Sequence, residues 1–312
     1  MFNLTTIFKS NTLKIYYTED FDNNDFLSSI DNTCYIFYQF TWNVEANITN
    51  FPFNYCSYFP KSFNVKTNLI FCAPNQFCKD KIIEKGYSAI LLNHNCLIDY
   101  NLFNIENKDK IYDAVINSRP FWWKRVYLAK KVNNLCYIKG NDWAKNETSW
   151  NGYKDMNLQL KTEIYPNEVI NIYNQSKVGL ILSGNTGENV QGWNEGANYS
   201  TCEYLLCGLS VITTPSQGGR DFWFDDYNSI VCEPNEDSVN ECVKIMLKRI
   251  ENNEINREII RNNTIQKMIN TRKNLINKLQ EIFNKYSINL DAEVYFQKIF
   301  FNKLTTYDNI KW

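Results

Sequence analysis

The sequence predicts an α/β protein built on parallel β-sheets, and three observations support this prediction. Short apolar runs alternate with amphipathic stretches of helical periodicity along most of the chain. Gly86, Pro166 and Gly208 stand at boundaries between such stretches. The 312 residues are enough for two domains, and the hydrophobic fraction of 44% is enough for a packed core.

Residues 1–108 are expected to form a short N-terminal domain in which strands dominate. The runs rich in β-branched and aromatic residues, each followed by turn residues, are 13–17, 34–40, 68–73 and 89–93. One helix is expected at 76–86, where Gly86 is a stop signal.

Residues 109–285 are expected to form a Rossmann-like domain of five or six parallel strands. Its predicted strands are 112–118, 135–138, 178–183 and 211–214, and the segments 158–164 and 229–234 continue the alternation. Its predicted helices are 121–132, 166–176, 195–208 and 237–250. Ligands of such sheets bind beyond the carboxyl ends of the strands, so the loops there are the first place to look for a site.

The C-terminal part is predicted to be helical over residues 254–285, where apolar residues recur at helical spacing. Basic residues outnumber acidic ones there, which favours a solvated basic face over a peripheral membrane or polyanion contact. Residues 286–312 are expected to form a C-terminal tail that could pack back on the N-terminal domain.

Composition excludes several classes of protein. A net charge of −1 does not fit a protein that coats nucleic acid. Ten cysteines without a CxxC pair, and a single histidine, do not fit a structural zinc site, so buried thiols in a reducing compartment are expected. No apolar run approaches 18 residues, so a soluble, cytoplasmic protein is expected.

Two glutamates mark the stretch with the most chemical signal. Glu195 and Glu203 are eight residues apart, so both would project on roughly the same side of the helix predicted at 195–208. Backbone N–H groups at the start of a helix suit a phosphate. The residues expected to supply them are Gly196, Ala197, Asn198 and Tyr199.

Cations and glycines follow other strands of the same predicted sheet. Arg119 comes directly after the strand at 112–118, and Lys124 and Arg125 follow it. Gly218 and Gly219 come after the strand at 211–214. Each feature alone is more often a surface charge or a turn. Together, at successive strand ends, they indicate a site for a diphosphate.

The stretch NEGANYSTCEYLLCGLSVITTPSQGG (194–219) resembles the donor-site signature of retaining GT-B glycosyltransferases of the family 4 type. That signature has two glutamates separated by seven residues, then G-[LP]-V and a GG loop. RPFWWKR (119–125) resembles the Arg–Lys diphosphate clamp of the family, and LLNHNCLIDYNLF (91–103) its domain-linking motif. The resemblance covers roughly residues 68–250 and is most specific over 183–234.

The resemblance implies a GT-B-like fold of two Rossmann-like domains, with the N-terminal one reduced and a helical C-terminal tail. It implies that Glu195 lies against the donor sugar and Glu203 binds the ribose. Arg119 and Lys124 would hold the diphosphate, with Arg125, the backbone of 196–199 and Gly218-Gly219 nearby. Such enzymes use a nucleotide-sugar donor and no metal cofactor.

The sequence departs from the family in several places. The N-terminal half is short, and no glycine-rich turn follows its first strand. The only histidine, His94, falls in the linking motif, where a structural role is favoured over a place at the reaction centre. RDFWF follows the GG loop where the family often has a glutamate.

These features predict a metal-independent retaining glycosyltransferase that moves a sugar from a nucleotide-diphosphate donor to a hydroxyl acceptor. The acceptor stays open among a glycan, a lipid-linked saccharide and other hydroxyls, as do the donor base and the oligomeric state. Aromatic residues that could stack on a sugar, but equally fit a core, are Trp42, Phe51, Phe53 and Tyr55.

The alternative function is a catalytically silent nucleotide-sugar-binding module. A dinucleotide-binding oxidoreductase is disfavoured because no GxGxxG turn follows an early strand.

Overall fold

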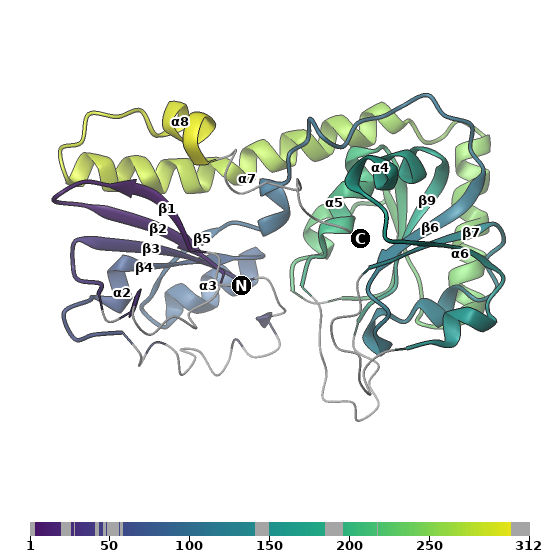
Figure 1. Ribbon diagram of the computed structural model, residues 1–312, viewed down its shortest axis with the longest axis horizontal. Helices are drawn as coiled ribbons and strands as arrows, with labels where there is room; N and C mark the ends of the chain where they lie inside the picture. The colour runs from purple at the N-terminus through teal and green to yellow at the C-terminus, as the bar shows by residue number, and fades with distance from the viewer. Residues whose placement is uncertain are drawn as a thin grey trace. The chain divides into compact units, whose positions relative to one another are not determined.

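The computed structural model describes most of the chain and divides it into two compact units (Figure 1). The described residues are 4–19, 26–27, 29–40, 44–45, 48, 56, 59–140, 150–184, 196–216 and 218–300. Among the described residues, unit 1 holds those up to Ile98 and those of 268–300, and unit 2 holds Asp99–Lys267. The chain therefore passes between units ten residues before the expected boundary at 108, and residues 268–285, assigned from the sequence to the C-terminal domain, belong with unit 1.

Unit 1 contains a five-stranded sheet in the order β1-β2-β3-β4-β5. The strands are β1 (Leu4–Lys9), β2 (Lys14–Thr18), β3 (Cys34–Gln39), β4 (Leu69–Ala73) and β5 (Ser88–Leu91). β1 pairs antiparallel with β2 and was not predicted, whereas the other four pair in parallel and match the predicted strands.

Helices cover this sheet on both faces. The short α2 (Val65–Asn68) and α3 (Gln76–Glu84) precede and follow β4, and α3 packs in a core cluster that contains Phe71, Cys78 and Ile82. The second half of α7 (Arg257–Lys285) contacts β1 and β3, since Phe283 packs on Phe8 and Lys285 donates to the hydroxyl of Tyr35, and Tyr295 at the end of α8 (Ala292–Tyr295) also packs on Phe8. The hydroxyl of Tyr295 donates to the carbonyl of Ile7 at 2.8 Å, so the segment after α7 is held against β1.

Unit 2 contains a six-stranded parallel sheet in the order β11-β10-β9-β6-β7-β8, which confirms the predicted Rossmann-like domain. The strands are β6 (Tyr112–Ser118), β7 (Leu135–Lys139), β8 (Leu158–Thr162), β9 (Ser176–Ile181), β10 (Ser210–Thr213) and β11 (Ser229–Val231). The helices are α4 (Pro166–Asn174), α5 (Tyr199–Leu206), α6 (Glu236–Glu251) and the first part of α7.

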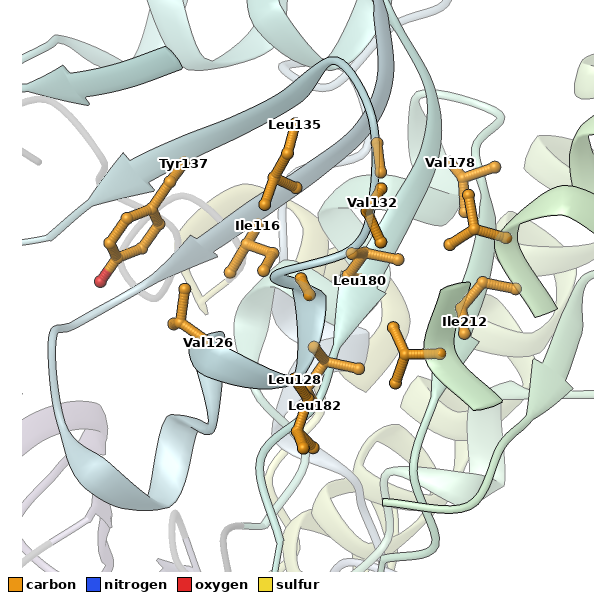
Figure 2. Close-up of a cluster of buried hydrophobic side chains, with 14 of the residues drawn as sticks. Ile116, Val126, Leu128, Val132, Leu135, Tyr137, Val178, Leu180, Leu182 and Ile212 are labelled. Carbon is orange, nitrogen blue, oxygen red and sulfur yellow. The ribbon is translucent and has the colours of Figure 1, made fainter. Parts of the chain in front are cut away.

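The two faces of this sheet follow from the two-residue period of its strands. Ile116 and Leu180 point into the main core cluster, which also contains residues of α6 and of the turn 126–129 (Figure 2). The alternate residues, Asn117 and Gly179, face α4 and α5. A Cβ atom at Gly179 would lie 2.4 Å from the ring of Tyr204, so glycine is needed there for α5 to pack against β9.

Two predicted helices of unit 2 are wrong in extent. Residues 121–132 form two 3-10 turns, Trp122–Lys124 and Val126–Ala129, instead of one helix. Arg125 separates them with a left-handed backbone (φ 48°), because its side chain turns into the protein. The helix predicted from residue 195 begins at Tyr199, after Asn198 with an extended backbone, and Gly208 ends it with φ 71° as expected.

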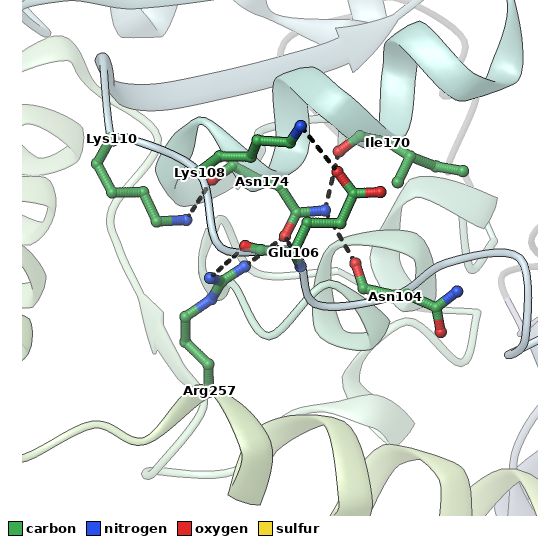
Figure 3. Close-up of polar contacts among 7 residues, drawn as sticks. All are labelled: Asn104, Glu106, Lys108, Lys110, Ile170, Asn174 and Arg257. Carbon is green, nitrogen blue, oxygen red and sulfur yellow. Dashed lines mark hydrogen bonds and ion pairs between the residues drawn. The ribbon is translucent and has the colours of Figure 1, made fainter.

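A polar network fixes the segment that leads into β6, at the amino edge of the sheet (Figure 3). The side chain of Asn174, at the end of α4, accepts from the backbone of Glu106 and from Arg257 at 2.7 Å each. Lys110 donates to the carbonyls of Asn174 and Ser176 at 2.6 and 2.8 Å. Lys110 and Arg257 thus bind backbone carbonyls at the ends of helices and strands, so this network has a structural role.

The cysteines behave as buried thiols. All ten are free, and eight of them are buried. Burial raises the pKa of Cys96, Cys136 and Cys232 to about 12, so these thiols stay protonated. No helix among the described residues is long and apolar enough to cross a membrane.

Candidate donor site

The order of strands in unit 2 puts a topological switch point between β6 and β9. From β6 the chain moves outward to β7 and β8, and it then returns to add β9 on the other side of β6. Loops that follow β6 and β9 therefore diverge at the carboxyl edge of the sheet. Ligands of open α/β sheets bind at such a switch point.

Arg119 and Lys124, the predicted diphosphate clamp, both come from the loop after β6. Arg119 directly follows the last residue of β6 and is exposed, whereas Lys124 ends the first 3-10 turn and is half-buried. Gly140, which follows the neighbouring strand β7, lies against Arg119: a Cβ atom there would be 3.3 Å from Cγ of Arg119. The structure thus places both cations at the switch point.

Arg125, predicted as a neighbouring donor-site cation, has a different position. Its side chain is buried, and its guanidinium donates through Nε to the carbonyl of Leu182 and through Nη2 to Oγ1 of Thr214, each at 2.6 Å. A Cβ atom at Gly184 would lie 2.6 Å from the same Nη2. Arg125 therefore ties together the loops that follow β6, β9 and β10.

Arg220 is a second buried arginine at this edge, and the sequence reasoning missed it. Its Nη1 donates to the carbonyl and to Oγ of Ser183 at 2.8 and 2.9 Å, and its Nη2 donates to the carbonyl of Thr214 at 2.7 Å. The only signal in the sequence was the position of Arg220 directly after the GG loop, where a cation departs from the family pattern.

The glycine loop and the start of α5 also lie at the carboxyl edge. Gly218 and Gly219 both have positive φ, 94° and 91°, so the turn needs glycine at each position. Gly196 and Ala197 are buried and precede α5, so only Tyr199 of the four residues expected at its N-terminus is helical.

Asn198 precedes α5 without capping it through its side chain. Its Nδ2 instead lies 3.4 Å from Oγ of Ser183, the residue that Arg220 also contacts. This contact links the start of α5 to the loop after β9.

Glu203 is fully buried in α5. Its Oε2 accepts a hydrogen bond of 2.7 Å from the hydroxyl of Tyr173 in α4. Glu195, predicted to lie beside it, is outside the described residues, as are Trp42, Phe51, Phe53 and Tyr55. The predicted pairing of the two glutamates therefore stays a prediction.

His94 lies in unit 1, where it begins a 3-10 turn (His94–Leu97) and is buried. The pair Asp225-Asp226 belongs to a turn, since the Asp225 carboxylate accepts from the backbone N–H groups of Tyr227 and Asn228. Within the described ranges, no three His, Cys, Asp or Glu residues gather as metal ligands would.

A comparison with protein families decides the class of this chain. Residues 123–284, more than half of the sequence, match the family described as glycosyl transferase-like. The chain belongs to that family. This glycosyltransferase matches no curated protein at a significant level by sequence.

Solved structures show that the fold is of the GT-B class. HepE from Anabaena, in complex with UDP, is similar with a TM-score of 0.56 and 11% identity, over 80% of this chain and 72% of HepE. A glycosyltransferase from Rickettsia africae has a TM-score of 0.56 and 13% identity, over 81% of this chain and 71% of the other. The pneumococcal O-GlcNAc transferase GtfA, in complex with UDP and GlcNAc, has a TM-score of 0.51 and 14% identity, over 81% of this chain and 53% of GtfA.

Proposed function

We propose that this glycosyltransferase, of the family 4 type, moves a sugar from a nucleotide-diphosphate donor to a hydroxyl acceptor, with retention of configuration and without a metal ion. The observation that carries the proposal is the position of Arg119, Lys124 and the start of α5 beyond β6 and β9, the strands that flank the switch point. Fixed cations and the N-terminus of a helix are the groups that hold a diphosphate in proteins.

The transfer needs little acid–base chemistry from the protein. The bond between the anomeric carbon and the phosphate oxygen breaks, and the acceptor oxygen bonds to the same carbon from the same face. The acceptor proton passes to the departing phosphate. Arg119 and Lys124 stabilise the charge that grows on the diphosphate, which lowers the barrier without a metal.

Other residues are proposed to bind the rest of the donor. Glu195 contacts the donor sugar, and Glu203 accepts hydrogen bonds from the ribose. The loop of Gly218 and Gly219 lets the donor approach the backbone closely. Because the HepE and GtfA structures contain UDP, uridine is the first base to test.

The test is nucleotide binding in the presence of EDTA. UDP, GDP, ADP and CMP are titrated against the protein, with melting temperature and calorimetry as readouts. One nucleotide should bind, and Lys124→Ala should weaken it by about tenfold, because a charged contact to the phosphates is lost.

Lys130→Ala is the matched control, since Lys130 is an exposed lysine six positions further along the same segment. Its binding constant should equal that of the wild type. If no nucleotide binds, or if both variants bind like the wild type, the proposed donor site is wrong.

A further inference from the structure

Two buried arginines meet at one buried threonine at the carboxyl edge of unit 2, and we call Arg125, Thr214 and Arg220 the arginine cluster. Arg125 donates to Oγ1 of Thr214 at 2.6 Å, and Arg220 donates to the carbonyl of Thr214 at 2.7 Å. The Thr214 hydroxyl lies 3.1 Å from the carbonyl of Leu182, to which Arg125 also donates. The cluster therefore joins the loop after β6 to the loops after β9 and β10.

This cluster fixes the backbone on both sides of Lys124. On one side, the carbonyl of Trp123 accepts from the backbone N–H of Gly184, in the loop after β9, at 3.3 Å. On the other side, the Arg125 side chain is bound to the loops after β9 and β10. Arg125 has a left-handed backbone (φ 48°), which is unfavourable for a residue other than glycine, so its side-chain contacts have to offset that cost. The turn that carries Lys124 is thus held by contacts that are distant in the sequence.

Gly184 is the position at which the cluster can be disturbed without a change of charge. A Cβ atom there would lie 2.6 Å from Nη2 of Arg125, which is too close, so the guanidinium would have to move away from Thr214. The same Cβ atom would lie 3.4 Å from Cζ of Arg125, which is an ordinary van der Waals distance. A lysine at position 125 is one atom shorter and has no group in the place of Nη2, so it would leave room for the added methyl group.

We propose that the arginine cluster positions Lys124 for the diphosphate of the donor, with Arg125 and Gly184 as positioning residues. The inference rests on the proposed function, in which Lys124 contacts the diphosphate. A lysine side chain loses conformational freedom when it binds a phosphate, and this loss weakens binding. When the backbone on both sides of the lysine is already fixed, only the side chain is left to be ordered, so the contact contributes more to affinity.

The test asks whether the contribution of Lys124 to binding depends on the cluster. The dissociation constant is measured by calorimetry in EDTA for whichever of UDP, GDP and ADP the wild type binds. Lys124→Ala should weaken binding about tenfold in the wild type, but by less than about threefold when Gly184→Ala is also present. Gly184→Ala alone should weaken it about threefold, because Lys124 is then no longer held in place.

Two controls identify the route of the effect. Lys130→Ala removes an exposed lysine of the same segment, and it should leave the dissociation constant unchanged with or without Gly184→Ala. In a protein that carries Arg125→Lys, Gly184→Ala should change the constant by less than about twofold, since Nη2 is absent. Arg125→Lys and Gly184→Ala both keep the charge of the wild type, so a loss of positive charge cannot account for their effects.

The outcomes separate this inference from the proposed function. If Lys124→Ala weakens binding about tenfold both with and without Gly184→Ala, the cluster does not position Lys124, and only this inference is overturned. If no nucleotide binds, or if Lys124→Ala has no effect in the wild type, the proposed function fails and this inference fails with it. If Gly184→Ala does not fold, Lys124→Ala is compared in the wild type and in Arg125→Lys, where its effect should fall in the same way.

Discussion

At the scale of single residues, arginines divide into two groups at the carboxyl edge of unit 2. Arg125 and Arg220 are buried, and their guanidinium groups bind backbone and hydroxyl oxygens of the loops after β9 and β10. Arg119 is exposed at the end of β6. The buried pair holds the loops together, and Arg119 is the arginine proposed to contact the diphosphate.

Substitution of Arg125 tests this division. Arg125→Lys should lower the free energy of unfolding by about 1–3 kcal/mol, because one ammonium group cannot reach both Leu182 and Thr214. Urea unfolding followed by tryptophan fluorescence measures the change. Arg249→Lys, at an arginine whose one backbone hydrogen bond is exposed, should change it by less than about 0.5 kcal/mol.

A different result would restore the role expected from the sequence. If Arg125→Lys were as stable as the wild type but lost nucleotide binding, Arg125 would be a donor ligand and not a structural tie.

The position of Glu203 on the predicted donor helix could be read from the sequence, but its partner could not. Tyr173 is 30 residues away and lies on the apolar side of the helix predicted at 166–176, where the sequence pattern indicates only core. The contact depends on the packing of α4 beside α5, and only tertiary structure supplies that.

At the scale of elements, the strands of unit 2 were predictable and the turn after β6 was not. The central strands β6, β9 and β10 are largely apolar and buried on both faces, so their composition alone marks them. Residues 121–132 carry helical spacing, yet Arg125 breaks it by reaching Leu182, 57 residues away in the chain. The spacing of apolar residues within one segment carries no information about a contact with a residue so far away in the chain.

The amino edge of the sheet provides a prediction on pH. Burial, and then the nearby charge of Arg257, lower the pKa of Lys110 to about 7 in the folded protein. In the unfolded chain a lysine has its ordinary pKa of about 10.4. Between these values the unfolded chain binds more protons, so the contribution of Lys110 to the free energy of unfolding rises from pH 7 to about pH 10. That contribution is lost again as the pH falls from about 10 to 7.

The measurement is the difference in unfolding free energy between the wild type and Lys110→Met from pH 6 to pH 10. The unfolding free energy of the wild type should rise relative to that of the variant as the pH rises, because methionine does not titrate. Lys108→Met controls for the loss of an exposed lysine in the same segment. A difference that stayed level, or fell, over this range would contradict the shifted pKa.

At the scale of the whole molecule, the sequence predicted two α/β domains but misplaced their limits. The predicted boundary followed the change in pattern near residue 108, whereas the chain enters unit 2 at Asp99. Helix α7 is continuous over Arg257–Lys285 but contributes to both units. A single helical pattern gives no sign that its two halves belong to different cores.

The family match and the GT-B fold make this chain a glycosyltransferase, and the site on unit 2 is proposed to use a nucleotide sugar without a metal. The most direct test is the release of nucleotide from UDP-, GDP-, ADP- and CMP-sugars by purified protein in EDTA, where the first three release a diphosphate and CMP-sugars release CMP. Nucleotide should be released from one class of donor, at a rate about tenfold lower in Lys124→Ala and unchanged in Lys130→Ala. Release that appeared only after a divalent metal was added, or that was indifferent to Lys124, would contradict the proposed function.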